Sequence, residues 1–76
     1  MDLRIGVIGD IVNSGRTAHC VEIKDDAQHT GGFLIVEWWD GSNGPNEHGA
    51  FDGWVENRKD LERYVRESNW KIRWRE

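Results

Sequence analysis

Three histidines and one cysteine are the side chains of this chain that could bind a soft or borderline metal ion. His19 and Cys20 are neighbours, while His29 and His48 stand apart from them. Zinc sites often take two ligands from one element at a C-x-x-C, H-x-x-x-H or H-E-x-x-H spacing, and none of these spacings occurs here. Neighbouring side chains of a strand point to opposite faces, so His19 and Cys20 are poorly placed to share one ion. We therefore expect no metal site.

The segment 40–50, DGSNGPNEHGA, offers oxygen atoms that could bind calcium, from Asp40, Ser42, Asn46 and Glu47. It lacks the D-x-[DN]-x-[DN]-G order and the acid at position twelve that an EF-hand calcium loop requires. Glycine, proline, asparagine and aspartate are the residues that form turns, and they explain this composition without an ion. We expect a surface loop here.

Gly6, Gly9 and Gly15 near the start of the chain invite comparison with phosphate-binding loops. Their spacing matches neither G-x-G-x-x-G nor a Walker A sequence, and no helix is expected to follow them. No Ser-His-Asp or Cys-His set can be assigned from the order of the residues, and 76 residues leave little room for a closed pocket. The sequence therefore predicts no cofactor, no catalytic residues and no enzymatic activity.

The end of the chain is basic, because residues 58–76 hold seven of its ten lysines and arginines. Residues 70–75, WKIRWR, interleave aromatic and cationic side chains, a composition with which proteins stack bases and contact phosphates. Strand alternation, however, places the tryptophans and the cations on opposite faces. Nucleic-acid binding is therefore the alternative function, with five candidate contacts: Arg63, Arg66, Lys71, Arg73 and Arg75.

Residues 39–57 carry four acidic side chains and no lysine or arginine. Alternation in the expected strand 51–56 places Trp54 on one face with Asp52 and Glu56, outside the core. An exposed tryptophan among charged side chains is typical of a protein-binding hot spot. We therefore predict a partner-binding surface made of six residues: Trp39, Asp40, Glu47, Asp52, Trp54 and Glu56.

A structural explanation for the same residues stays open. Trp54 could pack over the aliphatic stems of Lys71 and Arg73 on a neighbouring strand, with a modest cation–π contribution. The cations of that strand would then face Asp52 and Glu56.

The elements that must position these side chains are clearest after residue 56. Asn57 is expected to cap a helix, Asp60 supplies negative charge to its first turn, and Asn69 is expected to end it. Apolar or small side chains recur between them at i, i+3, i+4 and i+7, which predicts a narrow stripe that lies on a sheet. These positions are Leu61, Tyr64, Val65 and Ser68.

Alternation or apolar runs predict strands over 3–12, bent near Gly9, and over 17–24, 33–39, 51–56 and 70–75. The strand 33–39 is nearly all apolar, so we expect it to be central. Trp38 and Trp39 must point to opposite faces, and the sequence leaves open which of them faces away from the helix. In the last strand Trp70, Ile72 and Trp74 are expected to face the core.

Residues 1–76 are therefore expected to form one α+β domain, because a chain of this length holds one small core. Its architecture is a single, mostly antiparallel twisted sheet of about five strands in the order β-β-β-β-α-β, with one helix packed on one face. The helix should span about 16 Å, so the last strand should start back at the level where the fourth strand began and run parallel to it, while the order of the strands in the sheet stays open. The other face of the sheet stays open.

Cys20 is the only cysteine, which excludes an intrachain disulfide and suits a reducing compartment. The start of the chain lacks the basic and apolar regions of a signal peptide, and no apolar run is long enough to span a membrane. These features predict a cytoplasmic protein.

The net charge of −4, concentrated in the acidic stretch, favours a partner with a basic surface. We expect a small non-enzymatic protein-binding domain from a bacterium or phage. It would act as an inhibitor, of the immunity or anti-defence type, of a basic-faced toxin or nuclease. A homodimeric structural domain, whose uncovered sheet face pairs across a two-fold axis, is a further alternative.

Overall fold

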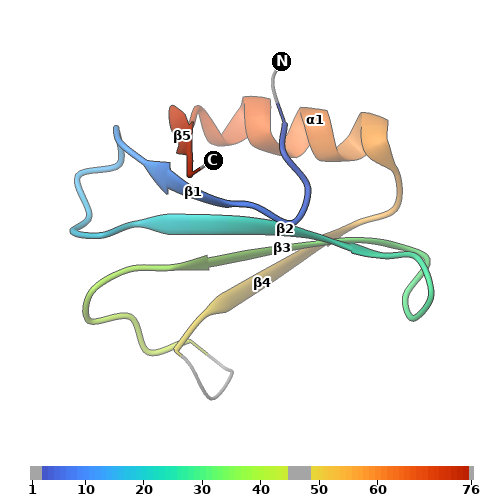
Figure 1. The fold of residues 1–76 in the computed structure, drawn as a ribbon, viewed down its shortest axis with the longest axis horizontal. Coiled ribbons are helices and arrows are strands. Elements are labelled where there is room, and N and C mark those ends of the chain that lie inside the picture. Colours follow the sequence, from blue (N-terminus) through green and yellow to red (C-terminus); the bar gives the residue numbers. More distant parts are fainter. Residues whose placement is uncertain (1–2, 45–48, 76) are drawn as a thin grey trace.

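The computed structural model describes residues 3–44 and 49–75. Its elements follow in the order β1 (Ile8–Ile11), β2 (Cys20–Asp26), β3 (Gly32–Trp38), β4 (Phe51–Val55), α1 (Arg58–Ser68) and β5 (Ile72–Trp74). The strands form one open sheet in the spatial order β4-β3-β2-β1-β5, and every neighbouring pair is antiparallel. Figure 1 shows α1 lying over one side of this sheet. The predicted α+β fold, with its order of elements and single helix, is confirmed.

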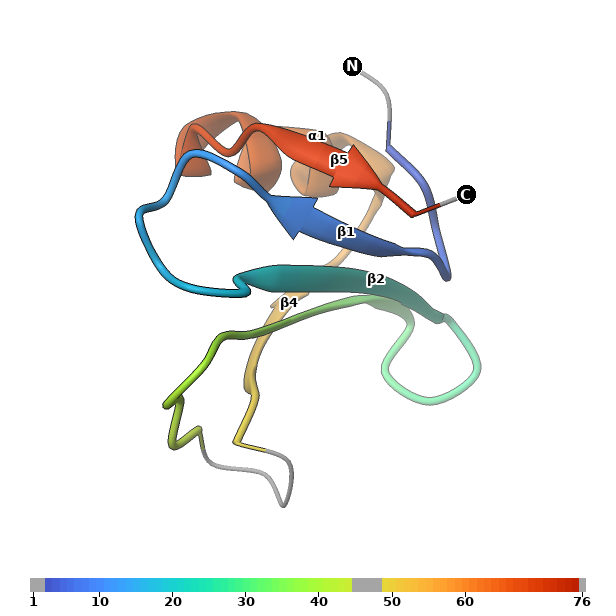
Figure 2. The same cartoon turned by 60° about the vertical axis from the view of Figure 1, so that its left-hand side comes forward.

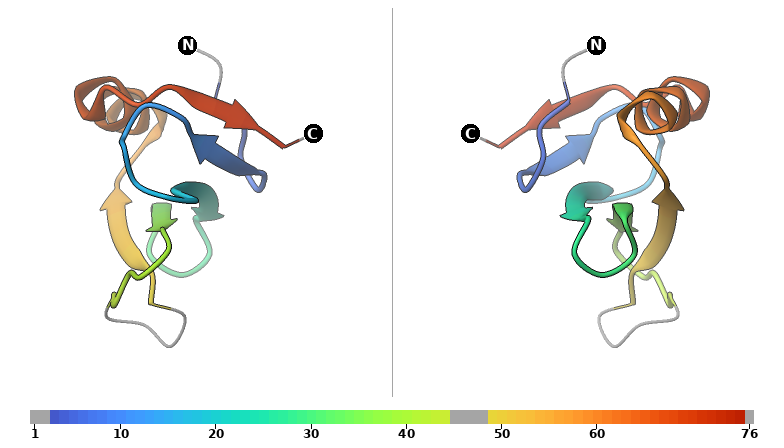
Figure 3. Two further views of the ribbon diagram at one scale, coloured as in Figure 1. Left: turned by 90° about the vertical axis from the view of Figure 1, so that its left-hand side faces the viewer. Right: turned by 90° about the vertical axis from the view of Figure 1, so that its right-hand side faces the viewer.

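The structure decides the position of β5 in the sheet, which the sequence left open. This strand runs in the same direction as β4, as predicted, but it pairs with β1 at the opposite edge. The sheet curls strongly, and Figure 3 shows α1 end on, between β4 and β5. Because the two edges of the curled sheet lie on either side of α1, the helix can begin beside β4 and end beside β1, where β5 pairs. The sequence pattern predicts the direction of β5 but does not record how strongly the sheet curls, so it does not determine the edge at which β5 pairs.

The predicted ends of α1 are confirmed. The Asn57 side chain accepts a hydrogen bond from the Asp60 amide at 2.9 Å, which satisfies one of the free donors of the first turn. Asn69 adopts the left-handed conformation at φ 59° and donates its amide to the Arg66 carbonyl. Leu61 and Val65 are the buried residues of the helix, as their spacing predicts.

One side chain attaches the end of α1 to the first strand. The Asn13 amide nitrogen donates to the Asn69 carbonyl, and the Asn13 amide oxygen accepts from the Lys71 amide, both at 2.8 Å. The Val12 amide also donates to the Lys71 carbonyl at 2.9 Å. These three bonds hold the chain beside β1 as β5 begins, a placement that Figure 2 shows clearly.

The core lies between α1 and the sheet. Trp70, Ile72 and Trp74 pack against it, as predicted, while Lys71 and Arg73 are exposed. Its buried side chains come from β1, β2, β3, α1 and the segment before β1: Leu3, Ile11, Val21, Ile23, Ile35, Leu61 and Val65.

The bend in the first strand lies at Gly6, so the expectation of a bend at Gly9 is wrong. Gly6 has φ +79°, and its amide donates to the Ile23 carbonyl at 2.8 Å. Gly9 lies within β1, where an added Cβ would come within 2.4 Å of Ile72 Cγ2 and 2.9 Å of Trp74 Cε3. Glycine at position 9 therefore permits close packing of β5 side chains on β1.

The single helix in the described ranges, α1, has eleven residues and is neither long nor apolar enough to cross a membrane.

Leu61→Ala is expected to lower the free energy of unfolding by about 2–5 kcal/mol, because the side chain is 0% exposed and its removal leaves a cavity. Urea unfolding followed by tryptophan fluorescence measures this change. Lys59→Ala, at an exposed position of the same helix, is the matched control and should change stability by less than about 0.5 kcal/mol. Equal effects of the two substitutions would contradict the assignment of the core.

Candidate functional site

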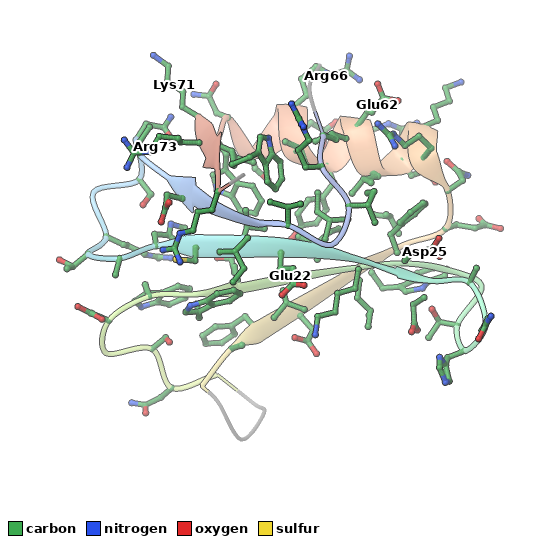
Figure 4. All side chains as sticks on the ribbon, viewed as in Figure 1. Glu22, Asp25, Glu62, Arg66, Lys71 and Arg73 are labelled. Atoms are coloured by element: carbon green, nitrogen blue, oxygen red, sulfur yellow. The ribbon has the colours of Figure 1, made fainter. Side chains whose placement is uncertain are left out.

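The side of the sheet that α1 leaves uncovered can be built from the pairing of the strands, since directly paired residues point to the same face. One row of paired residues crosses four strands, from Ile8 through Glu22 and Val36 to Asp52. Their neighbours along the strands, such as Ile23 and Ile35, belong to the buried core, so this row faces away from the helix. Figure 4 shows Glu22 on the side of β2 away from α1.

Two further rows lie beside the first one. Asp10, Cys20 and Trp38 form a row on β1, β2 and β3. Lys24, Leu34 and Trp54 form a row on β2, β3 and β4. We call the whole surface the open face, and its residues are Ile8, Asp10, Cys20, Glu22, Lys24, Leu34, Val36, Trp38, Asp52, Trp54 and Arg73.

A cavity of about 550 Å³ lies on the open face. Leu34, Val36 and Trp38 of β3 form its apolar centre, and Glu22 and Asp52 provide carboxylates on either side of Val36. Trp38 is therefore the outward tryptophan of the pair at the end of β3, a choice that the sequence left open. The surface of the cavity therefore has an apolar centre with charged flanks.

Trp54 lies on the open face, as alternation predicts, and is 47% exposed. Its indole nitrogen donates to the Thr30 hydroxyl at 2.8 Å, and its ring covers Gly32, where an added Cβ would lie 2.9 Å from the indole. The alternative in which Trp54 packs over Lys71 and Arg73 is wrong, because β4 and β5 lie at opposite edges of the sheet. For the same reason the cations of β5 do not face the acids of β4.

Trp39 lies on the other side of the sheet from Trp54. Its ring stacks on Phe51 at 5.2 Å, and the Arg16 guanidinium lies 4.1 Å from the ring centroid. The indole is thus covered by an aromatic ring and by a cation. The structure brings Asp52 and Trp54 together and leaves Trp39 apart from them.

Two further members of the predicted partner-binding set, Asp40 and Glu56, do not line the cavity. Asp40 is exposed in the turn after β3, and Glu56 is exposed directly after β4. Glu47 falls outside the described residues.

His19 is the centre of a polar network that the sequence analysis missed. The ring is 4% exposed, with Nδ1 lying 2.7 Å from the Ser14 hydroxyl and Nε2 lying 3.3 Å from a Glu37 carboxylate oxygen. Trp39 and Trp70 meet the ring edge-on at 5.4 and 6.2 Å. These residues have the order of a serine–histidine–acid set, but the sheet separates them from the cavity. The network holds the β1–β2 loop against β3 and the end of α1.

A second polar network joins β1, β2 and the residue after β5. Arg75 donates to both carboxylate oxygens of Asp10, at 2.7 and 3.0 Å, and this pairing lowers the pKa of Asp10. Cys20 Sγ lies 3.7 Å from the same carboxylate, and burial raises the pKa of its thiol. A buried cysteine with a raised pKa carries little thiolate, so Cys20 is expected to be unreactive.

The five basic residues considered for nucleic-acid binding have different surroundings. Arg75 is bound to Asp10, and Arg63 lies 3.5 Å from Asp60. Arg66, Lys71 and Arg73 are exposed, and Figure 4 shows Arg66 on the helix and the other two at β5. In the described ranges no group of three histidine, cysteine or acidic side chains is placed to hold a metal ion.

Comparison of the chain with protein-family models, with curated proteins and with solved structures finds no match in any of the three.

The Asp10–Arg75 pair predicts an acid-dependent loss of stability. A carboxylate whose pKa is lower in the folded state stabilises the fold above its unfolded pKa, here near 3.8, and loses that effect as the pH falls through the folded pKa. The difference in unfolding free energy between the natural protein and Asp10→Asn should therefore shrink below about pH 4. Urea unfolding between about pH 6 and pH 2 measures it.

Arg75→Gln removes the cause of the lowered Asp10 pKa. The difference in unfolding free energy between the natural protein and Arg75→Gln should therefore also shrink below about pH 4. Curves for the natural protein and both variants that stay parallel over the whole range would show that the pair does not contribute.

Proposed function

We propose that this chain is a small non-enzymatic protein-binding domain that docks onto a basic-surfaced protein through its open face. The observation that carries this proposal is the cavity on that face, with Trp38, Leu34 and Val36 at its centre. By analogy of size and charge, the partner is a toxin or nuclease that the domain inhibits.

The apolar part of the open face supports docking because these side chains still have contact with water to lose. Leu34, Val36 and Trp38 are each half-buried, and Trp54 on the same face is almost half exposed. Removing such surface from water stabilises a complex by about 25 cal/mol per Å² before the costs of association. Tryptophan is also the residue most enriched among binding hot spots.

Two of the three charged residues that line the cavity are acidic, with Lys24 as the third, and this balance favours a basic partner. Glu22 and Asp52 lie on either side of Val36, and Asp40 and Glu56 are exposed nearby in the sequence stretch that has no lysine or arginine. Acidic surfaces attract basic ones over about a Debye length and so raise association rates. Proteins that hold nucleic acid present such basic surfaces.

Nucleic-acid binding by the chain itself is less well supported. Of its five candidate contacts, Arg75 and Arg63 are held by Asp10 and Asp60. A phosphate would therefore have to compete with a carboxylate at each of these two positions. Titration of a fluorescent oligonucleotide at low and high salt tests this class directly, because phosphate contacts weaken steeply with ionic strength.

Trp54→Ala is expected to leave the fold intact and to weaken partner binding by at least about thirtyfold, the effect of losing a hot spot of about 2 kcal/mol. The tagged domain is used to capture proteins from a lysate of its source cells, and the affinity of a captured basic protein is then measured by calorimetry. Asp52→Lys should weaken the same complex by slowing association.

Phe51→Ala is the matched control, since Phe51 is a 39% exposed aromatic residue of the same strand on the opposite face. It should retain the partner. Retention of the partner by Trp54→Ala and its loss with Phe51→Ala would show that the binding surface is the other face. Recovery of nothing but copies of the chain would contradict the proposed function.

A further inference from the structure

We infer that the free chain pairs with a second copy of itself through the open face, in a register that places Glu22 of each copy against Lys24 of the other. This inference does not depend on the identity of a partner protein. It follows from the order of charged and apolar side chains along two neighbouring rows of the sheet.

The two rows are defined by the pairing of β2, β3 and β4. The first row holds Glu22 and Val36, and the second holds Lys24 and Leu34. On β4 the first row ends at Asp52 and the second at exposed Trp54. Residues i and i+2 of a strand lie on one face about 7 Å apart, so the rows run side by side.

A two-fold axis between these rows makes the open face complementary to itself. An axis that lies in the interface, perpendicular to the strands, exchanges the two rows between the copies. Glu22 then faces Lys24 of the second copy, and Val36 faces Leu34 of the second copy. Each contact occurs twice, which yields two ion pairs beside an apolar centre.

The charges select this orientation over the symmetric arrangements about a parallel axis. A two-fold axis parallel to the strands and centred on β2 would place Glu22 on Glu22 and Lys24 on Lys24, and like charges that face each other at an interface repel. A parallel axis between β2 and β3 would place Glu22 on Val36 and Lys24 on Leu34, which leaves all four charges without a partner. The perpendicular axis instead pairs Glu22 of each copy with Lys24 of the other copy.

The geometry also indicates a weak dimer. Stable interfaces bury about 800 Å² per partner, whereas the paired rows span only three strands of a 76-residue domain. The helix covers the concave side of the curled sheet, so the open face is convex, and two copies would meet only along a strip where the valine and leucine side chains can touch. The ion pairs lie beside solvent, so salt should weaken the association.

Sedimentation velocity of the full chain from about 10 µM to about 1 mM at low salt tests the inference. The natural protein should change from monomer to dimer over this range. Glu22→Lys and Lys24→Glu should each weaken the dimer by about tenfold or more, since each places like charges in contact. The double variant exchanges the charges and should restore dimerisation to within about threefold of the natural protein.

The matched control exchanges the charges of Arg58 and Glu62, an ion pair on the exposed surface of α1, and should leave dimerisation unchanged. Circular dichroism verifies that every variant is folded. A monomer at all concentrations would overturn the inference, as would a dimer that survives both single substitutions or one that the double variant does not restore. If the chain is monomeric at all concentrations but still captures a partner protein, the proposed function is supported and the dimer is overturned. The two proposals can therefore be tested independently.

Discussion

The pairing of β5 with β1 is the constraint on which the rest of this structure depends. It places Ile72 and Trp74 over Gly9, where any larger residue would collide with them. The Asn13 amide holds the preceding segment in register through bonds to the backbone of Asn69 and Lys71. Once β5 is held at that edge, α1 must cross between the two edges of the sheet and cover its concave side.

One helix covers one side of the five-stranded sheet, and the second side remains partly exposed to solvent. On the helix side the alternation of β2 and β3 delivers Val21, Ile23 and Ile35, which are almost fully enclosed. On the open face the same alternation delivers Leu34 and Val36, which are partly exposed. The side chains of this second set lose their remaining contact with water only when another surface covers them.

The polar networks at the edges of the sheet explain why several candidate residues are unsuited to binding. His19 has partners on both ring nitrogens, and Arg75 is held by both oxygens of Asp10. A ligand that used either side chain would first have to replace short hydrogen bonds. Trp38 and Trp54 present apolar ring surface instead, so docking there mainly displaces water.

Local patterns were sufficient to predict the helix, its caps at Asn57 and Asn69, the order of elements and the face on which Trp54 lies. Each of these depends on residues close together in the chain, through capping geometry or alternation. The edge at which β5 pairs, and the choice of Trp38 as the outward indole, were decided only by contacts between residues far apart in the sequence. A curled sheet brings distant edges to one helix, and no periodicity within a strand records how strongly that sheet will curl.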